Sequence, residues 1–373
     1  MIKSCYIHIP FCKKICSYCD FCKNYYNELV VDGYLDNLKK EISKNYKNEV
    51  LDTLYIGGGT PSSLSSKNLN KLIYILKTFK LNHDYEYTFE CNYEDINEKM
   101  LLALKSGGVN RISIGIQTFN EKYSKVLNRD INKKKMIENI NLAKRYFSNI
   151  NIDLMYALPG ESINDLKSDL EIIKMLDVSH ISTYALIIEE HTNLKLQNIK
   201  ETCDDIQNKM YYLILDYLKN NGYNHYELSN FAKEKYESRH NLTYWNNDNY
   251  YGFGAGASGF VNNVRYDNTK SVFKYNAGIT RVYEEKLSIN ELMKDEVMLS
   301  LRKISGINKD IFYKKYDVLL EDVFDYKDLV RNNFLTETGK FVYIKEDKLF
   351  VSNEIIIMML DAFKYWIIVL INV

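Results

Sequence analysis

Four cysteines lie within eleven residues near the start of the chain, in the stretch YIHIPFCKKICSYCDFC (6–22). Cys12, Cys16 and Cys19 have the spacing C-x3-C-x2-C, and Cys22 follows three residues later. Clustered thiolates of this kind hold zinc or an iron–sulfur cluster. Four thiolates could close a zinc tetrahedron, but structural zinc sites usually pair two separated C-x2-C turns. Because one loop carries all four, the spacing favours a cluster and leaves zinc as the alternative.

Other residues with useful chemistry follow in order along the chain. GGGTP (57–61) is a glycine-rich turn, and further on come Glu90, Gln117, Arg129 and Asp153. A [4Fe–4S] cluster held by three thiolates leaves one iron without a protein ligand, and S-adenosylmethionine (SAM) can chelate that iron. One-electron reduction then breaks a sulfonium C–S bond and releases a 5′-deoxyadenosyl radical. Such a site needs a glycine-rich strand end and polar side chains around the ribose, and both are present.

Six short runs rich in β-forming residues must position these groups. They span 5–11, 53–59, 86–92, 111–117, 150–158 and 180–187. Helical stripes separate them, and a stripe of Ile206, Met210, Leu213 and Tyr217 follows the last. The alternation predicts an α/β fold, a partial (β/α)6 TIM-like barrel, whose chemistry gathers at the C-terminal ends of the strands.

The pattern changes after the sixth strand. We predict four segments: a barrel over 1–225, an irregular connecting region over 226–288, a small α+β domain over 289–365, and an apolar tail over 366–373. The connecting region is rich in Asn, Gly and aromatic residues and indicates loops and irregular strands. In the α+β domain, we expect a hairpin with its turn near Glu346–Asp347.

Composition narrows the classes of function. Forty-nine basic and 49 acidic residues cancel, so no charge imbalance indicates nucleic-acid binding. The N-terminus lacks the apolar region of a secretory signal, which predicts a cytoplasmic protein with reduced thiols. The apolar C-terminal run contains Asp361 and Lys364, so it is interpreted as a packed helix and tail and not as a membrane anchor.

The combined motifs resemble a known family. C-x3-C-x2-C after YIHIPF, followed by GGGTPSSL, ECN, SIGIQTF, NIDLMYALPGE and HISTYALIIEEHT, is similar to the radical SAM superfamily. Within it, the resemblance is to the oxygen-independent coproporphyrinogen III oxidase family, and particularly to its heme chaperone branch, HemW. It runs from about Tyr6 to Glu354 and implies that 289–365 is a HemN-type C-terminal domain.

The resemblance also implies cofactors and site residues. It implies a [4Fe–4S] cluster on Cys12, Cys16 and Cys19. Cys22 does not match the family pattern and is interpreted as a bystander thiol, with an exchangeable ligand or a redox-sensitive site as alternatives. The resemblance implies SAM contacts from Tyr6, Tyr18, Gly58, Gly59, Thr60, Glu90, Gln117, Arg129, Asp153 and Ala185. RHNLTYW (239–245) matches the H-N-x-x-Y-W motif associated with heme binding in this branch, which makes His240 a candidate heme ligand.

Two functions remain open on this resemblance. The oxidases carry a further cysteine two residues after the third cluster cysteine, whereas this chain has Phe21, as the heme chaperones do. The first hypothesis is a heme chaperone that carries heme as cargo to hemoproteins such as respiratory enzymes. The alternative is an oxidase that decarboxylates coproporphyrinogen III to protoporphyrinogen IX, so enzymatic activity stays undecided. The resemblance is compatible with a homodimer and with transient membrane association.

Overall fold

The computed structural model describes residues 1–364, so the predicted apolar tail over 366–373 lies outside the described residues. The chain forms two compact units. Unit 1 comprises Met1–Asn224, Phe231–His240 and Asn249–Glu285. Unit 2 comprises His225–Asn230, Asn241–Asp248 and the described part of Lys286–Val373. Both units are therefore discontinuous in the sequence.

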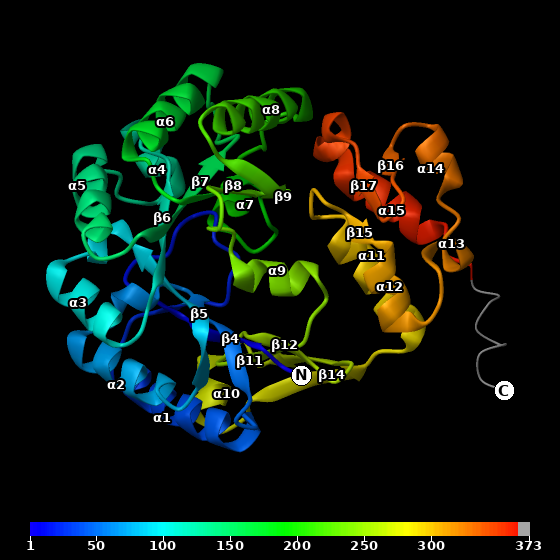
Figure 1. Ribbon diagram of the computed structural model, residues 1–373. Coiled ribbons are helices and arrows are strands. Elements are labelled where there is room, and N and C mark those ends of the chain that lie inside the picture. Colours follow the sequence, from blue (N-terminus) through cyan, green and yellow to red (C-terminus); the bar gives the residue numbers. More distant parts are fainter. Residues whose placement is uncertain (365–373) are drawn as a thin grey trace. The chain divides into compact units, whose positions relative to one another are not determined.

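Six parallel strands form the centre of the sheet in unit 1 (Figure 1). They are β1 (Ser4–Ile9), β4 (Val50–Gly58), β5 (Lys80–Asn92), β6 (Arg111–Gln117), β7 (Asn149–Tyr156) and β8 (His180–Ala185). Neighbours follow the order β1-β4-β5-β6-β7-β8. Each strand overlaps one of the six predicted runs, and the predicted α/β fold class is confirmed.

A helix follows most of these strands and packs outside them (Figure 1). The main ones are α1 (Glu28–Asn45), α2 (Ser66–Leu76), α3 (Glu98–Ser106), α5 (Lys133–Lys144), α6 (Ile163–Leu176) and α8 (Asp204–Asn220). In α1, Leu35, Leu38 and Ile42 are buried as their spacing predicts. Asn27 caps this helix by accepting hydrogen bonds from the backbone N–H groups of its first turn.

The predicted buried stripe of α8 was partly right, since Met210 is buried and Leu213 and Tyr217 are half-buried. Ile206 is exposed, and the face that packs inward contains Met210, Tyr211, Ile214, Leu215 and Leu218. Both stripes have helical spacing, because apolar and tyrosine residues occur on several sides of this helix. Only the face with Ile214 and Leu218 gives two adjacent rows, and two rows bury more apolar surface than one.

The sequence did not predict that the sheet continues beyond β1. Strand β11 (Tyr250–Phe253) pairs in parallel with β1, and β12 (Ser258–Val261), β13 (Val264–Asn268) and β14 (Arg281–Lys286) extend the sheet. These strands are only four to six residues long. The β12–β13 turn consists of Asn262 and Asn263, both with positive φ, as a two-residue hairpin turn requires.

Unit 2 contains a three-stranded sheet and several helices. Strand β17 (Phe341–Ile344) lies between β15 (Ile307–Asn308) and β16 (Leu335–Glu337). The main helices are α11 (Ile289–Ser300), α12 (Lys309–Tyr316) and α15 (Ser352–Asp361), with the shorter α13 (Leu320–Val323) and α14 (Lys327–Arg331). The core of the unit includes Val297, Leu301, Phe312, Val342 and Met359.

The hairpin turn in unit 2 was predicted at the wrong place. The β16–β17 turn lies at Thr338–Lys340, where the Thr338 hydroxyl accepts a hydrogen bond from the N–H of Phe341 at 3.0 Å. Glu346–Val351 forms a 3-10 helix. Gly339 and the threonine hydroxyl favour the earlier turn. Within residues 1–364, none of the helices has both the length and the apolar character that a membrane crossing requires.

Candidate functional site

The cysteine loop is fixed at both ends and in its middle. Strand β2 (Phe11–Cys12) pairs with β3 (Asn24–Tyr25), and the N–H of Tyr26 donates to the carbonyl oxygen of Cys12 at 2.9 Å. Midway, the N–H of Ser17 donates to the carbonyl oxygen of Leu127 at 3.1 Å. The backbone that carries the thiols is therefore held by the protein's own hydrogen bonds.

The three motif thiols lie close enough to influence one another. Burial raises the pKa of Cys12 to about 11; the Thr60 hydroxyl opposes this shift, and Cys19 and Cys16 add to it. Burial also raises the pKa of Cys19, with Cys16 contributing. Thiolates gathered in this way repel one another until a cation balances them. The trio thus fits a centre that supplies positive charge.

Cys22 has a different environment. Its Sγ donates to the carbonyl oxygen of Lys270 at 3.1 Å, and the charges that act on it are those of Lys270 and Lys23. All seven cysteines are free thiols. Within residues 1–364, no group of three His, Cys, Asp or Glu side chains could hold a single metal ion. A cubane cluster distributes its thiolates over separate iron atoms, so it needs wider spacing than a mononuclear zinc site.

The end of β4 passes between the cysteine loop and a buried carboxylate, and only glycine fits there. A Cβ on Gly57 would lie 2.8 Å from the carboxyl group of Glu90, and one on Gly59 would lie 2.9 Å from Sγ of Cys12. Gly58 has φ +124°, and its N–H donates to Oε2 of Glu90 at 3.0 Å. The glycine-rich turn therefore brings backbone without a side chain beside Cys12 and Glu90.

Two carboxylates lie inside the barrel near this strand end. Burial and the charge of Asp153 raise the pKa of Glu90 to about 7. The Tyr55 hydroxyl donates to Oε1 of Glu90 at 2.8 Å. Burial also raises the pKa of Asp153, whose Oδ1 accepts a hydrogen bond from Nδ2 of Asn151 at 2.8 Å. The buried cation Arg111 lowers both pKa values. The structure therefore brings Glu90 and Asp153 together.

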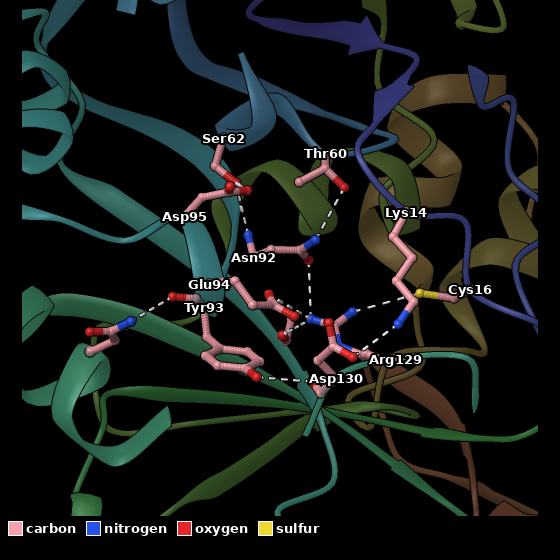
Figure 2. Close-up of polar contacts among 12 residues, drawn as sticks. Lys14, Cys16, Thr60, Ser62, Asn92, Tyr93, Glu94, Asp95, Arg129 and Asp130 are labelled. Atoms are coloured by element: carbon pink, nitrogen blue, oxygen red, sulfur yellow. Dashed lines mark hydrogen bonds and ion pairs between the residues drawn. The ribbon is translucent and has the colours of Figure 1, made fainter. Parts of the chain in front are cut away.

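Arg129 connects the cysteine loop to the ends of β5 and β6 (Figure 2). Its Nη2 donates to Oδ1 of Asn92 at 3.1 Å and to the carbonyl oxygen of Gly115 at 2.5 Å, and its Nη1 is 3.9 Å from Sγ of Cys16. Burial opposes its charge, but Tyr18, Cys16 and Glu94 outweigh burial and raise the pKa of the guanidinium.

Asn92 and Thr60 continue this network beyond Arg129 (Figure 2). Nδ2 of Asn92 donates to Oγ1 of Thr60 at 3.4 Å, and Thr60 Oγ1 donates to Sγ of Cys12 at 3.5 Å. Sequence reasoning did not select Asn92 as a site residue, although it ends the strand that carries Glu90. Nor did it select Arg111 or Tyr55, because inward-facing strand residues resemble ordinary alternation.

The remaining predicted SAM residues are distributed around the same strands. Gln117 ends β6 with φ +70°, and Ala185 ends β8, where it pairs with Tyr156. Tyr6 lies within β1, and its hydroxyl is 2.9 Å from Nδ1 of His8. The pKa of Tyr18 is raised by burial and by Cys16, which places this phenol beside the thiols.

His240 lies elsewhere. It is in the first turn of α9 (Arg239–Trp245), and its Nδ1 is 2.7 Å from Oγ1 of Thr53. The backbone N–H of His240 donates to Oε1 of Glu86 at 3.0 Å, and its ring stacks on Tyr55 with 5.1 Å between the ring centroids. Thr53 and Glu86 precede the C-terminal ends of β4 and β5. Burial, with the charge of Arg111, lowers the pKa of His240 to about 3. The structure does not bring it to the cysteines.

Comparison with known proteins identifies the family. Residues 6–173 match the family model of the radical SAM superfamily. The chain is 40% identical over 330 residues to a heme chaperone HemW of Lactococcus lactis, covering 86% of this chain and 87% of that protein. It is 36% identical over 372 residues to a heme chaperone HemW of Bacillus subtilis, covering 95% and 98%.

A solved structure shows the same fold. Coproporphyrinogen III oxidase (HemN) from Escherichia coli, described as a radical SAM enzyme, superposes with a TM-score of 0.85 and 22% identity, covering 96% of this chain and 90% of that chain. Membership of the superfamily implies a [4Fe–4S] cluster and SAM. On its match to both curated relatives over most of their length, the chain belongs to the HemW family within the radical SAM superfamily.

Proposed function

We propose that this protein is a heme chaperone, which binds heme and delivers it to hemoproteins without decarboxylating a porphyrinogen. The observation that carries the proposal is the 36–40% identity to relatives named heme chaperone HemW over 86% or more of this chain. The local sequence agrees with it, since Phe21 occupies the position of the oxidases' additional cysteine and its side chain is 70% exposed.

We infer that Cys12, Cys16 and Cys19 hold the cluster. The thiols fit it because one loop carries them, they influence one another's pKa values, and Thr60 and Arg129 direct N–H or O–H groups at two of the sulfurs. Hydrogen bonds to a cluster sulfur stabilise its negative charge and raise the reduction potential. When bound, the cluster would supply one-electron reduction chemistry at this site.

The protein's own groups would orient SAM. Glu90 and Asp153 offer carboxylate oxygens suited to ribose hydroxyl groups, and the backbone of Gly58 and Gly59 approaches closely because it lacks Cβ atoms. The two carboxylates also favour the positive sulfonium. We place the protein in the cytoplasm, because seven free thiols suit a reducing compartment.

His240 of the H-N-x-x-Y-W motif is the candidate heme ligand, but its ring is not accessible to heme in this conformation. The ring is 1% exposed, is bound to Thr53 and stacks on Tyr55. Axial ligation would require the ring to leave these contacts. His240→Ala removes them and is expected to lower the free energy of unfolding by about 2–4 kcal/mol. Thermal melting beside the exposed control His83→Ala measures this cost.

One anaerobic experiment tests the proposed function. Protein reconstituted with iron and sulfide is incubated with coproporphyrinogen III, SAM and a reductant, and in parallel is titrated with heme. We expect saturable heme binding and no release of carbon dioxide. Catalytic release of carbon dioxide with formation of protoporphyrinogen IX would replace the chaperone proposal with the oxidase alternative. Loss of heme binding in His240→Ala, with a folded barrel, would support ligation by that residue.

A further inference from the structure

Unit 2 contains two adjacent cations beside an aromatic ring, outside the site described above. Arg302 and Lys303 follow α11, and the guanidinium carbon of Arg302 is 5.9 Å from the centre of the Trp245 ring. Both cations are half-buried. Burial lowers the pKa of Arg302, with the charge of Glu227 opposing, and burial also lowers the pKa of Lys303. For Lys303 the charges of Glu296 and Asp248 oppose this shift, so burial outweighs the nearby carboxylates at both cations.

The backbone holds these cations in place. The N–H of Leu228 donates to the carbonyl oxygen of Arg302 at 3.1 Å, and the N–H of Ile304 donates to that of Tyr226 at 3.1 Å. Glu227 and Lys303 form an antiparallel bridge between these two bonds. The positions of Arg302 and Lys303 are thus set by paired backbone and not by a mobile loop.

Two hydrogen-bond donors lie at this place without an acceptor. Within residues 1–364, the guanidinium of Arg302 makes no hydrogen bond and no ion pair, and the buried Nε1 of Trp245 has no acceptor. Nζ of Lys303 donates to Oδ1 of Asn246 at 2.6 Å. The carboxylate of Glu227 is already occupied, because it accepts from Asn230 and from the N–H of Ser229. A half-buried guanidinium without an acceptor is costly, and an anion would remove the cost.

We propose that Arg302, assisted by Lys303, binds the carboxylate groups of the porphyrin cargo beside the Trp245 ring. This inference rests on the proposed heme binding. Heme carries two propionates on one edge of a flat apolar macrocycle. A guanidinium pairs with a carboxylate through two parallel hydrogen bonds, and an indole ring offers a flat apolar surface to the macrocycle. The competing explanation is that Arg302 only balances the charge of Glu227.

The test compares heme with heme dimethyl ester, whose propionates are uncharged, on the full-length reconstituted protein. We expect the parent protein to bind heme at least roughly tenfold more tightly than the ester, as charge-assisted hydrogen bonds imply. Arg302→Met should reduce this preference to about twofold or less, and Arg302→Lys should retain part of it. Arg331→Met is the matched control, since Arg331 is an exposed arginine of the same unit that pairs with Asp328.

Each outcome decides between the explanations. An equal preference for heme in the parent and in Arg302→Met overturns the inference, as does equal binding of heme and ester by the parent. Failure of the parent to bind either ligand overturns the proposed function itself. If Arg302→Met does not fold, Glu227→Gln serves instead, because it removes the opposing charge and should increase the preference for heme. An unchanged preference there would support the charge-balancing explanation.

Discussion

At the scale of single residues, the barrel interior holds two carboxylates and one cation with little direct pairing. Arg111 is 2% exposed, its Nη1 is 3.5 Å from Oγ1 of Thr88, and its buried Nε has no partner within the described residues. Its charge nevertheless lowers the pKa values of Glu90 and Asp153. Because burial disfavours charge, this cation helps to keep the carboxylates ionised.

The pKa of Glu90 predicts a pH dependence of SAM binding. Burial raises it from 4.5 to about 7, so the side chain gains its charge between pH 6 and pH 8. If the carboxylate form binds SAM, affinity should be roughly tenfold higher at pH 8 than at pH 6, following the ionised fraction. Equilibrium dialysis with the reconstituted protein measures this. Glu90→Gln should bind weakly at both values, and a sloping profile in that variant would contradict the assignment.

The raised pKa of Glu90 also predicts how the stability of the folded protein changes with pH. A carboxyl group whose pKa is higher in the folded protein than in the unfolded chain binds its proton more tightly when folded. Its contribution to the free energy of unfolding is therefore largest below its ordinary pKa of 4.5 and decreases as pH rises through about 7. Glu90→Gln removes that dependence, so its stability relative to the parent should improve from pH 5 to pH 8.

Arg111→Met should move the SAM-binding profile to higher pH. Removing the cation takes away a contribution that lowers the pKa of Glu90, so the midpoint should rise above about 7. Arg111→Lys keeps the charge and should restore the parent midpoint. A purely structural role for Arg111 would weaken SAM binding equally at every pH, and that result would contradict this prediction.

At the scale of elements, the end of β4 can lie against the cysteine loop only because Gly59 has no Cβ. Gly59→Ala would place a Cβ 2.9 Å from both Sγ of Cys12 and the N–H nitrogen of Phe11. We expect reduced iron and sulfide content after reconstitution and a loss of about 1–3 kcal/mol of stability from overpacking. Gly339→Ala is the control, because a Cβ there meets no atom within 4 Å. Full cluster loading in Gly59→Ala would contradict the close approach.

Some of these elements could be predicted from the sequence and others could not. The six barrel strands were predictable, since all are rich in strand-forming residues and three of them, β4, β5 and β6, end in Gly, Asn or Gln. The positions and pairing of strands β11–β14 were not, because strands of four to six residues between turns show no clear period. Arg111 illustrates the same limit in the site, since an arginine that begins a strand gives no sign of which way it points. Thr60 and Arg129 entered through motif resemblance, and their contacts with sulfur came from the fold.

At the scale of the whole molecule, one helix belongs to both units. His240 is part of unit 1, whereas Asn241, Tyr244 and Trp245 of the same motif are part of unit 2. The sequence predicted one connecting region over 226–288. In the structure the residues of this range are divided between the two units, because the chain passes from one unit to the other several times. The seven-residue helix α9 therefore carries both His240, which belongs to the barrel unit, and Trp245, which lies beside Arg302 in unit 2.

This division predicts that the two ligands protect different amides from hydrogen exchange. SAM should slow exchange in unit 1 at 57–60 and 90–92, and heme should slow it in unit 2 at 241–248 and 302–304, because bound ligands suppress local opening around their sites. Mass spectrometry with SAM alone, heme alone and both separates the two patterns. Heme dimethyl ester should protect 302–304 less than heme does. If heme instead protects mainly 57–60 and 90–92, the porphyrin lies beside SAM as a substrate would, and the oxidase alternative gains the support that the chaperone proposal loses.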